Sequence, residues 1–392
     1  MHLLYLKSYY HPEIAASSYL SNNLLEDLLK QKTNKVVLHV PSPSRGLSTE
    51  EIRKYKTKKI EEIYNGKLKV YRFAMFREGN NTFLRGVRYF LCHLIHFIKG
   101  VQEKNMDVLF LASTPPTQGA MGALVKKIKK IPMVYNLQDV FPDSLVATGL
   151  THKGSLLWKI GRIIEDFTYR NADKIIVISE GFKKNIMDKG VPESKIEVIY
   201  NWVDENEVFP VEREHNLLFK RYNLDPKRFY VTYNGNVGHS QNMDLLLDIA
   251  IMFQDKPEIQ FILMGEGAYK KQMEKRIVTE HISNVTLLPF QPYEEISHVF
   301  SMGDVGLVIS KENVGQNSVP SKTWSIMSAA RPVLASFDEN SELHTIIEEN
   351  NIGCFVKAGD KKALYDAIQY LYVNPDQREQ FGQNGRNYIL KN

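Results

Sequence analysis

Short apolar runs recur along the chain, and a stretch of helical periodicity follows each of them. Alternation of this kind is typical of a parallel β-sheet covered by helices on both faces. The pattern restarts after about the middle of the chain, and 392 residues exceed what one hydrophobic core usually serves. We therefore expect two α/β domains. The runs lie at 2–6, 35–40, 107–113, 132–137 and 174–179 in the first series, and at 229–238, 259–267, 284–290, 305–310 and 331–337 in the second.

An acidic stretch without apolar periodicity, NWVDENEVFPVEREHN at 201–216, separates the two series. Such a segment suits a connection between domains. We predict a first domain over 1–208 and a second over 209–375. Sheets of this type bind ligands at the carboxyl ends of their strands, so two facing domains would form a central cleft.

Composition excludes several classes of protein. A hydrophobic content of 43% with 24% charged residues is ordinary for a folded chain. The net charge of +5 gives no support for nucleic-acid binding. Cys92 and Cys354 lack the spacing of a metal or redox site and fit a reducing compartment. The start lacks a signal-peptide pattern, and no apolar run reaches the ~20 residues of a membrane-spanning helix, so we expect a cytoplasmic protein.

Two segments combine basic and bulky apolar residues. They are FLRGVRYFLCHLIHFIKG at 83–100 and ALVKKIKKIPM at 123–133, the second containing Lys126, Lys127, Lys129 and Lys130. Both could face anionic lipid. Two core-packed helices with solvated basic faces are an equal alternative.

A glycine turn after the first strand of the second series is a candidate anion site. In VTYNGNVGHSQNMD, Gly235 and Gly238 precede a helix that starts near Asn242. Small residues let backbone N–H groups approach a phosphate at a helix N-terminus. A plain turn is an equal alternative, because this is neither a Walker loop nor a full dinucleotide fingerprint.

Two further turns follow strands of the second series. In LMGEGAYKK, an αL turn is the favoured role for Gly265 and Gly267, with Glu266 exposed between them. In LLPFQPYEEI, the aromatic Phe290 and the free backbone groups around Pro292 could edge a nucleobase or merely turn the chain.

The segment NSVPSKTWSIMS at 317–328 opens with polar groups at a predicted helix start. Pro320 suits the first helical turn, while Ser318, Ser321 and the neighbouring N–H groups point out of the helix. With Lys322 added, a diphosphate would be well held. A capped helix with a surface lysine is the equal alternative.

These motifs, taken in order, resemble the family 4 glycosyltransferases, which are retaining enzymes of the GT-B fold with two Rossmann-like domains. The resemblance covers nearly the whole chain and looks closest to a subgroup that builds bacterial capsule or O-antigen repeats, including transferases of N-acetyl-L-fucosamine. The matching pieces are YYHPEIAASSYL (9–20), NLQDVFPDSLVATG (136–149), NADKIIVIS (171–179), VIYNWVD (198–204), YNGNVGHSQNMD (233–244), MGEG (264–267) and VPSKTWSIMSAARPVLA (319–335).

The resemblance implies a nucleotide-sugar donor bound to the second domain. Lys322 would contact the donor phosphates, and Phe290 and Gln291 would meet the base. The family's paired glutamates are replaced by Asn317 and Ser325. The donor residues are then Gly235, Asn236, Val237, Gly238, Gln241, Glu266, Phe290, Gln291, Asn317, Ser318, Val319 and Ser321, with Asn236 and Gln241 standing where relatives carry a phosphate-clamping arginine and lysine.

On the first domain the resemblance points to Asp139, which follows the strand at 132–137. It would hold a sugar hydroxyl or stabilise positive charge at the anomeric carbon, with helix capping as the alternative. Glu13 would bind acceptor or sugar. Ala15 and Ala16 stand where relatives carry a glycine pair, which makes close approach of a ligand less easy.

The implied function is that of a retaining, hexosyltransferase-type enzyme. It would move an N-acetylated amino or deoxy sugar from a UDP-sugar to a polyprenyl diphosphate-linked saccharide, for capsule, O-antigen or exopolysaccharide. Catalysis would rest on Asp139 and Lys322 and require no metal or cofactor. The basic helices would rest on the inner membrane face, and 376–392 would pack back on the first domain. A non-catalytic subunit and a UDP-sugar 2-epimerase on the same fold are the alternatives.

Overall fold

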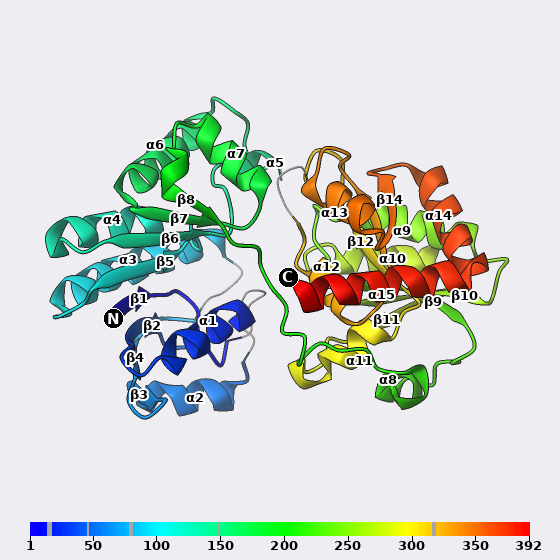
Figure 1. Cartoon of the computed structure of the whole chain (residues 1–392), viewed down its shortest axis with the longest axis horizontal. Coiled ribbons are helices and arrows are strands. Elements are labelled where there is room, and N and C mark those ends of the chain that lie inside the picture. Colours follow the sequence, from blue (N-terminus) through cyan, green and yellow to red (C-terminus); the bar gives the residue numbers. More distant parts are fainter. Residues whose placement is uncertain (14–17, 45–46, 78–80, 148, 316–318) are drawn as a thin grey trace. The chain divides into compact units, whose positions relative to one another are not determined.

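The computed structural model describes residues 1–13, 18–44, 47–77, 81–147, 149–315 and 319–392. The chain divides into two compact units. The first comprises Met1–Ile178 and Phe182–Tyr200, and the second comprises Ser179–Gly181 and Asn201–Asn392. Each unit is a sheet with helices on both faces, as the alternating runs predicted (Figure 1). The division falls ahead of the predicted boundary after residue 208, and Val208 is part of the second unit's core.

The sheet of the first unit has the strand order β3-β4-β2-β1-β5-β6-β7-β8. Neighbouring strands are parallel, except that β3 runs antiparallel to β4. The central strand β1 is paired on both sides, with Leu4 opposite Val37 of β2 and Leu109 of β5. The strands are β1 (His2–Leu6), β2 (Lys35–Pro41), β3 (Ile60–Ile63), β4 (Leu68–Phe73), β5 (Val108–Ala112), β6 (Met133–Leu137), β7 (Lys174–Val177) and β8 (Ile196–Val198).

The helices of the first unit cover the two faces of this sheet. Leu3 and Tyr5 of β1 pack on one face with Leu25 of α1. Leu4 and Leu6 pack on the other face, in a core to which α4, α6 and α7 contribute and against which α3 packs. The helices are α1 (Ser18–Lys30), α2 (Thr49–Thr57), α3 (Thr82–Gln102), α4 (Gln118–Lys129), α5 (Asp143–Ala147), α6 (Leu156–Asn171) and α7 (Glu180–Asp188), with a 3₁₀ turn η1 (Glu193–Lys195).

The sheet of the second unit has the order β11-β10-β9-β12-β13-β14, and its described neighbours are all parallel. The strands are β9 (Phe229–Asn234), β10 (Ile259–Met264), β11 (Val285–Leu288), β12 (Val305–Ile309), β13 (Val333–Phe337) and β14 (Gly353–Lys357). The helices are α8 (Leu217–Arg221), α9 (Met243–Met252), α10 (Lys270–Thr279), α11 (Ile296–Ser301), α12 (Lys322–Ser328), α13 (Glu342–Asn350), α14 (Lys361–Val373) and α15 (Pro375–Lys391), with 3₁₀ turns η2 (Arg213–His215) and η3 (Tyr293–Glu295).

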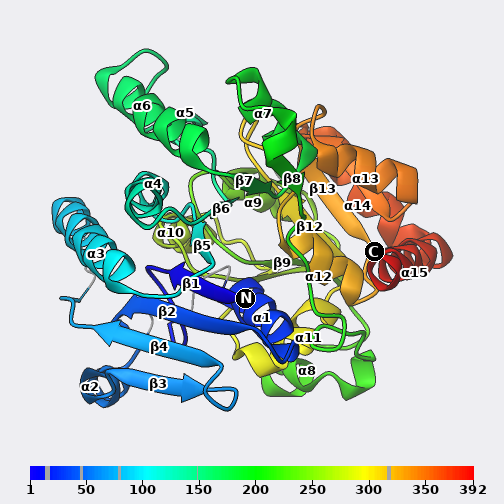
Figure 2. The same ribbon diagram turned by 60° about the vertical axis from the view of Figure 1, so that its left-hand side comes forward.

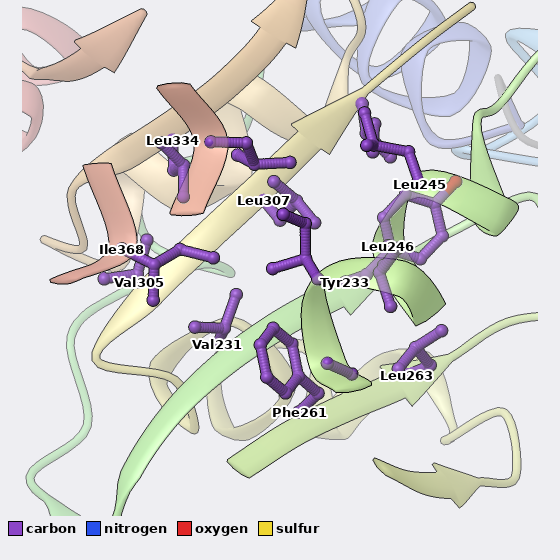
Figure 3. Close-up of a cluster of buried hydrophobic side chains, with 14 of the residues drawn as sticks. Val231, Tyr233, Leu245, Leu246, Phe261, Leu263, Val305, Leu307, Leu334 and Ile368 are labelled. Carbon is purple, nitrogen blue, oxygen red and sulfur yellow. The ribbon is translucent and has the colours of Figure 1, made fainter. Parts of the chain in front are cut away.

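The core of the second unit lies on both faces of its central strand β9. Val231 and Tyr233 point to one face and meet Leu246 of α9, as Figure 3 shows. Tyr230 points to the other face, where the core includes Trp324 of α12. Because β9 is buried on both faces, it reads as a nearly continuous apolar run, which is why the sequence revealed it.

The last helix, α15, belongs to the second unit. Tyr388 of α15 stacks on Trp324 of α12 with 6.3 Å between ring centroids. A side chain at Gly382 would come within 2.3 Å of the Ala330 carbonyl oxygen, so α15 packs closely here. Helix α15 thus packs on α12 within the second unit, and the return of 376–392 to the first domain stays a prediction.

Among the described residues, none of the helices combines the length and the hydropathy needed to cross a bilayer.

Candidate functional site

Lys322 lies at the carboxyl end of the central strand of the second unit. Its Nζ sits 3.8 Å from the ring centroid of Tyr233, over the aromatic face. Gly235, the first residue after β9, has φ +136°, and a Cβ there would lie 3.1 Å from the Lys322 Nζ. Glycine is thus needed here both for the backbone conformation and to leave room for the lysine.

The ammonium of Lys322 is half-buried and has few partners. Within the described part of the chain, its side chain forms the cation–π contact with Tyr233 but neither an ion pair nor a hydrogen bond. Burial lowers the pKa of Lys322 from 10.5 to about 7. A bound anion would reverse this effect, since a nearby negative charge favours the protonated form.

Two glycine turns pack backbone against backbone beside this lysine. A Cβ at Gly265 would lie 1.9 Å from the Gly235 carbonyl oxygen, and one at Gly267 would lie 2.1 Å from that of Val237. The Val237 amide donates to the Glu266 carbonyl at 2.9 Å. The αL role predicted for Gly265 and Gly267 is wrong, because neither has a positive φ; both are glycine because the two turns approach so closely.

The side chain of Gln241 forms hydrogen bonds with the turn at 235–238. Its Oε1 accepts from the Gly238 amide at 3.1 Å and from the Asn236 Nδ2 at 3.3 Å. A carboxamide oxygen thus occupies the hydrogen-bonding position that a phosphate oxygen would take. An anion that binds the Gly238 amide would displace the Gln241 Oε1 from that amide.

Three of the residues predicted to bind the donor differ in exposure. Phe290 is 60% exposed on the loop after β11. Gln291 is buried, and its amide donates to the Tyr222 hydroxyl at 2.8 Å, so its side chain is held inside the unit. Glu266 is exposed and pairs with Lys270 at 2.6 Å. Of these side chains, that of Phe290 is the one open to a planar ligand.

The start of α12 presents fewer side chains that could contact a ligand than the sequence predicted. Val319 is buried in the hydrophobic core, so its side chain is structural. Ser321 is exposed at the helix N-cap, and its side chain makes no capping hydrogen bond. Asn317 and Ser318 lie outside the described residues, as do Ala15 and Ala16 of the first unit.

Asp139 follows β6 at the carboxyl end of the first unit's sheet. Its carboxylate accepts from the Ser144 hydroxyl at 3.1 Å, and its amide donates to the Ser113 Oγ at 3.1 Å. Burial raises the pKa of Asp139. With Tyr135 and Glu165 it lines a small cavity. A positioned carboxylate with raised proton affinity suits a hydrogen bond to a ligand hydroxyl.

Glu13, the other predicted residue of the first unit, is buried and accepts from the Ser44 amide at 2.8 Å. Its carboxylate therefore holds the loop that contains Ser44. Sequence reasoning missed Lys7, which directly follows β1 and lies over the rings of Tyr5 and Tyr10. Burial lowers the pKa of Lys7 to about 7, and the nearby Glu13 counteracts that shift. The one available signal was a lysine placed directly after the first strand.

A buried ionic network beside Asp139 also went unnoticed. Glu165 of α6 contacts Arg162, accepts from the Tyr169 hydroxyl at 2.7 Å and pairs with Lys189 at 3.0 Å. Lys189 also pairs with Asp143 at 2.8 Å. The network ties α5 and α6 to the loop after α7.

Across the residues that the structure places, no three His, Cys, Asp or Glu side chains gather closely enough to hold a metal ion.

Comparison with solved structures defines the fold. The whole chain aligns with the structure described as Anabaena Alr3699/HepE in complex with UDP-glucose, at a TM-score of 0.72 and 16% identity, over 95% of that chain. The fold is GT-B, with two Rossmann-like α/β domains. Residues 23–207 match the family model Glycosyltransferase Family 4, and residues 215–388 match the model Glycosyl transferases group 1. The chain belongs to the glycosyltransferases that combine these two domains.

Two bacterial glycosyltransferases are among the curated relatives, and both are of moderate similarity. The chain is 28% identical over 294 residues to the probable glycosyltransferase WbjE of Pseudomonas aeruginosa, covering 74% of this chain and 73% of the relative. It is 24% identical over 256 residues to the putative colanic acid biosynthesis glycosyl transferase WcaI of Escherichia coli strain K12, covering 64% and 63%.

Proposed function

We propose that the protein is a retaining glycosyltransferase that uses a UDP-sugar. Its product would be a lipid-linked saccharide for bacterial capsule, O-antigen or exopolysaccharide, and the transferred sugar an N-acetylated amino or deoxy hexose. A relative named for colanic acid biosynthesis and a fold neighbour solved with UDP-glucose support this proposal.

The observation that carries the proposal is the position of Lys322. Its ammonium lies beside Gly235 at the carboxyl end of β9, and it has neither an ion pair nor a hydrogen bond among the described residues. Carboxyl ends of parallel strands are where sheets of this type bind ligands. A lysine kept half-buried and unpaired at such a place is suited to a diphosphate.

The proposed chemistry needs fixed positive potential at the leaving group. As the bond between the sugar and the diphosphate breaks, negative charge grows on the phosphate oxygens, and a preorganised ammonium stabilises that charge. Lys322 and the amide of Gly238 would supply it without a metal ion. Phe290, exposed on the loop after β11, would stack on the uracil.

Asp139 would act on the transferred sugar. Its carboxylate is held by Ser144 at the carboxyl end of the sheet, which fixes its direction. It would accept a hydrogen bond from a sugar hydroxyl or stabilise positive charge at the anomeric carbon. The acceptor would be a polyprenyl diphosphate-linked saccharide, which places the reaction at the inner face of the plasma membrane.

Calorimetric titration with UDP and with GDP tests the donor site. We expect UDP to bind to the wild type, and we expect Lys322→Ala to weaken binding at least about tenfold, the effect of losing one charge-assisted contact. Lys362→Ala is the matched control, because Lys362 is an exposed lysine of the same unit paired with Asp366. Preference for GDP would overturn the choice of donor. Binding of neither nucleotide would overturn the enzyme assignment and favour a non-catalytic subunit.

A further inference from the structure

Helix α3 of the first unit turns its apolar face away from the core. Phe83 and Phe90, one heptad apart, are 77% and 70% exposed, and the same side of the helix carries exposed Leu94 and Ile98. The side against the sheet instead carries buried polar groups, among them His96, whose Nε2 donates to the His39 carbonyl at 3.2 Å. This is the reverse of the pattern of a surface helix in water.

Helices α4 and α6 continue this surface. They pack in the order α3, α4, α6 along one face of the sheet, side by side in both views (Figure 1, Figure 2). Leu124 and Ile128 of α4 are exposed, and Ile163 of α6 is 69% exposed. Leu156, one heptad before Ile163, is also exposed. Exposed apolar side chains gathered on three neighbouring helices are typical of an interaction site.

The lysines of α4 are divided between two roles. Lys126 pairs with Asp173 at 2.7 Å, and Lys129 donates to the Glu103 carbonyl, so both stabilise the unit itself. Lys127 is exposed between Leu124 and Ile128, with its Nζ 4.9 Å from the ring centroid of Phe167. Lys130 is exposed after the helix end. Among these four lysines, Lys127 and Lys130 are therefore the ones whose side chains form neither an ion pair nor a hydrogen bond with the described residues of the unit.

We propose that the outward apolar face of α3, α4 and α6 docks on an anionic lipid bilayer. The Phe and Leu side chains would enter the boundary between headgroups and acyl chains, while Lys127 and Lys130 reach anionic headgroups. This deepens the proposed function, because it names the surface by which the enzyme meets a membrane-held acceptor. Apolar insertion, rather than a polybasic patch, supplies most of the affinity.

The charge of these helices favours an anionic bilayer, rather than a second copy of this chain, as the binding partner of the apolar face. Helices α3 and α4 contain Lys and Arg but neither Asp nor Glu. In α6, Asp166 pairs with Arg162 at 2.6 Å, and Glu165 contacts Arg162 and pairs with Lys189 at 3.0 Å, so both acids have cationic partners within the unit. A second copy would bring cations against cations, whereas an anionic bilayer supplies the opposite charge.

Vesicle sedimentation tests the docking surface without any need for donor, acceptor or turnover. The wild type is compared with Phe83→Glu/Phe90→Glu on vesicles of phosphatidylcholine with and without phosphatidylglycerol. Val278→Glu is the matched control, because Val278 is 72% exposed on α10 of the second unit. A second variant, Leu156→Glu/Ile163→Glu, probes the same surface through α6.

We expect the wild type and Val278→Glu to sediment with anionic vesicles, and each double variant to show a partition coefficient lower by about tenfold or more. Retained UDP binding in the double variants will show that they are folded. Equal sedimentation of the wild type and both variants would overturn the proposal. So would a wild type that ignores vesicles and forms a dimer that the variants abolish. Failure of UDP binding with intact vesicle binding would count against the donor assignment alone.

Discussion

Binding of UDP is expected to draw one proton onto Lys322. In the free protein burial lowers the pKa of this lysine from 10.5 to about 7, so close to half of the molecules carry a neutral amine at pH 7. A diphosphate beside the Nζ restores the ordinary pKa because it favours the charged form. Binding above pH 7 must therefore take a proton from the buffer.

The size of this effect follows from the two pKa values. Between pH 7 and pH 9 the protonated fraction of free Lys322 falls from about one half to about one in a hundred. The dissociation constant for UDP should rise about 50-fold over that range, or about 2.3 kcal/mol. Below pH 6 the lysine is fully charged and contributes no further pH dependence.

The assay is calorimetry at pH 8 in buffers that differ in ionisation enthalpy. At this pH the terminal phosphate of UDP, with a pKa of about 6, is already ionised, so it adds no proton of its own. We expect uptake of about 0.9 proton per UDP bound. Lys322→Arg is the control, since its guanidinium stays charged and takes up none. Wild-type binding without proton uptake, at constant affinity from pH 7 to pH 9, would refute the reasoning.

Three other perturbations test separate parts of the structure. Lys322→Met should raise the free energy of unfolding at pH 6 by about 1–3 kcal/mol in chemical denaturation, because the wild type must bury a charge at that pH. Between pH 7 and pH 10.5 the unfolded wild type binds more protons than the folded wild type, so the wild type gains stability and the advantage of the variant should shrink. Gly235→Ala should lose about 1–2 kcal/mol in the same measurement, from its φ of +136° and the Cβ placed 3.1 Å from the Lys322 Nζ; an unchanged midpoint would contradict the strain argument. Lys189→Met should cost about 3 kcal/mol because Glu165 loses a buried partner, and a Glu165→Gln/Lys189→Met double variant should recover part of that loss.

Much of the fold was readable because its central strands are buried on both faces. Strands such as β1 and β9 form nearly continuous apolar runs, and each is the first strand of its unit. The edge strand β3 escaped notice because its sequence, IEEI, is half acidic. Strand β8 has only three residues, too few to show any period. Edges and short strands take their structure from neighbours rather than from their own pattern.

Site residues that belong to a local motif were predictable from the sequence, whereas contacts between segments distant in the sequence were not. A lysine beside a helix start and a glycine after a strand are local signals, and Lys322 and Gly235 indeed lie together. The contact between Gly265 and Gly235 joins two turns that have no local signature of each other. The outward orientation of the apolar side of α3 was also not predictable, because the periodicity of a helix has the same form whether its apolar side faces the core or the solvent.

The contact between the two glycine turns has a practical consequence for protein engineering. Residues 235–238 and 265–267 hold each other through backbone atoms, so neither segment keeps its shape when moved alone. A graft of the first turn into another scaffold would lose the carbonyl of Glu266 that anchors Val237. The two segments, though far apart in sequence, must therefore be transferred together, and a library that randomises one of them must vary the other with it.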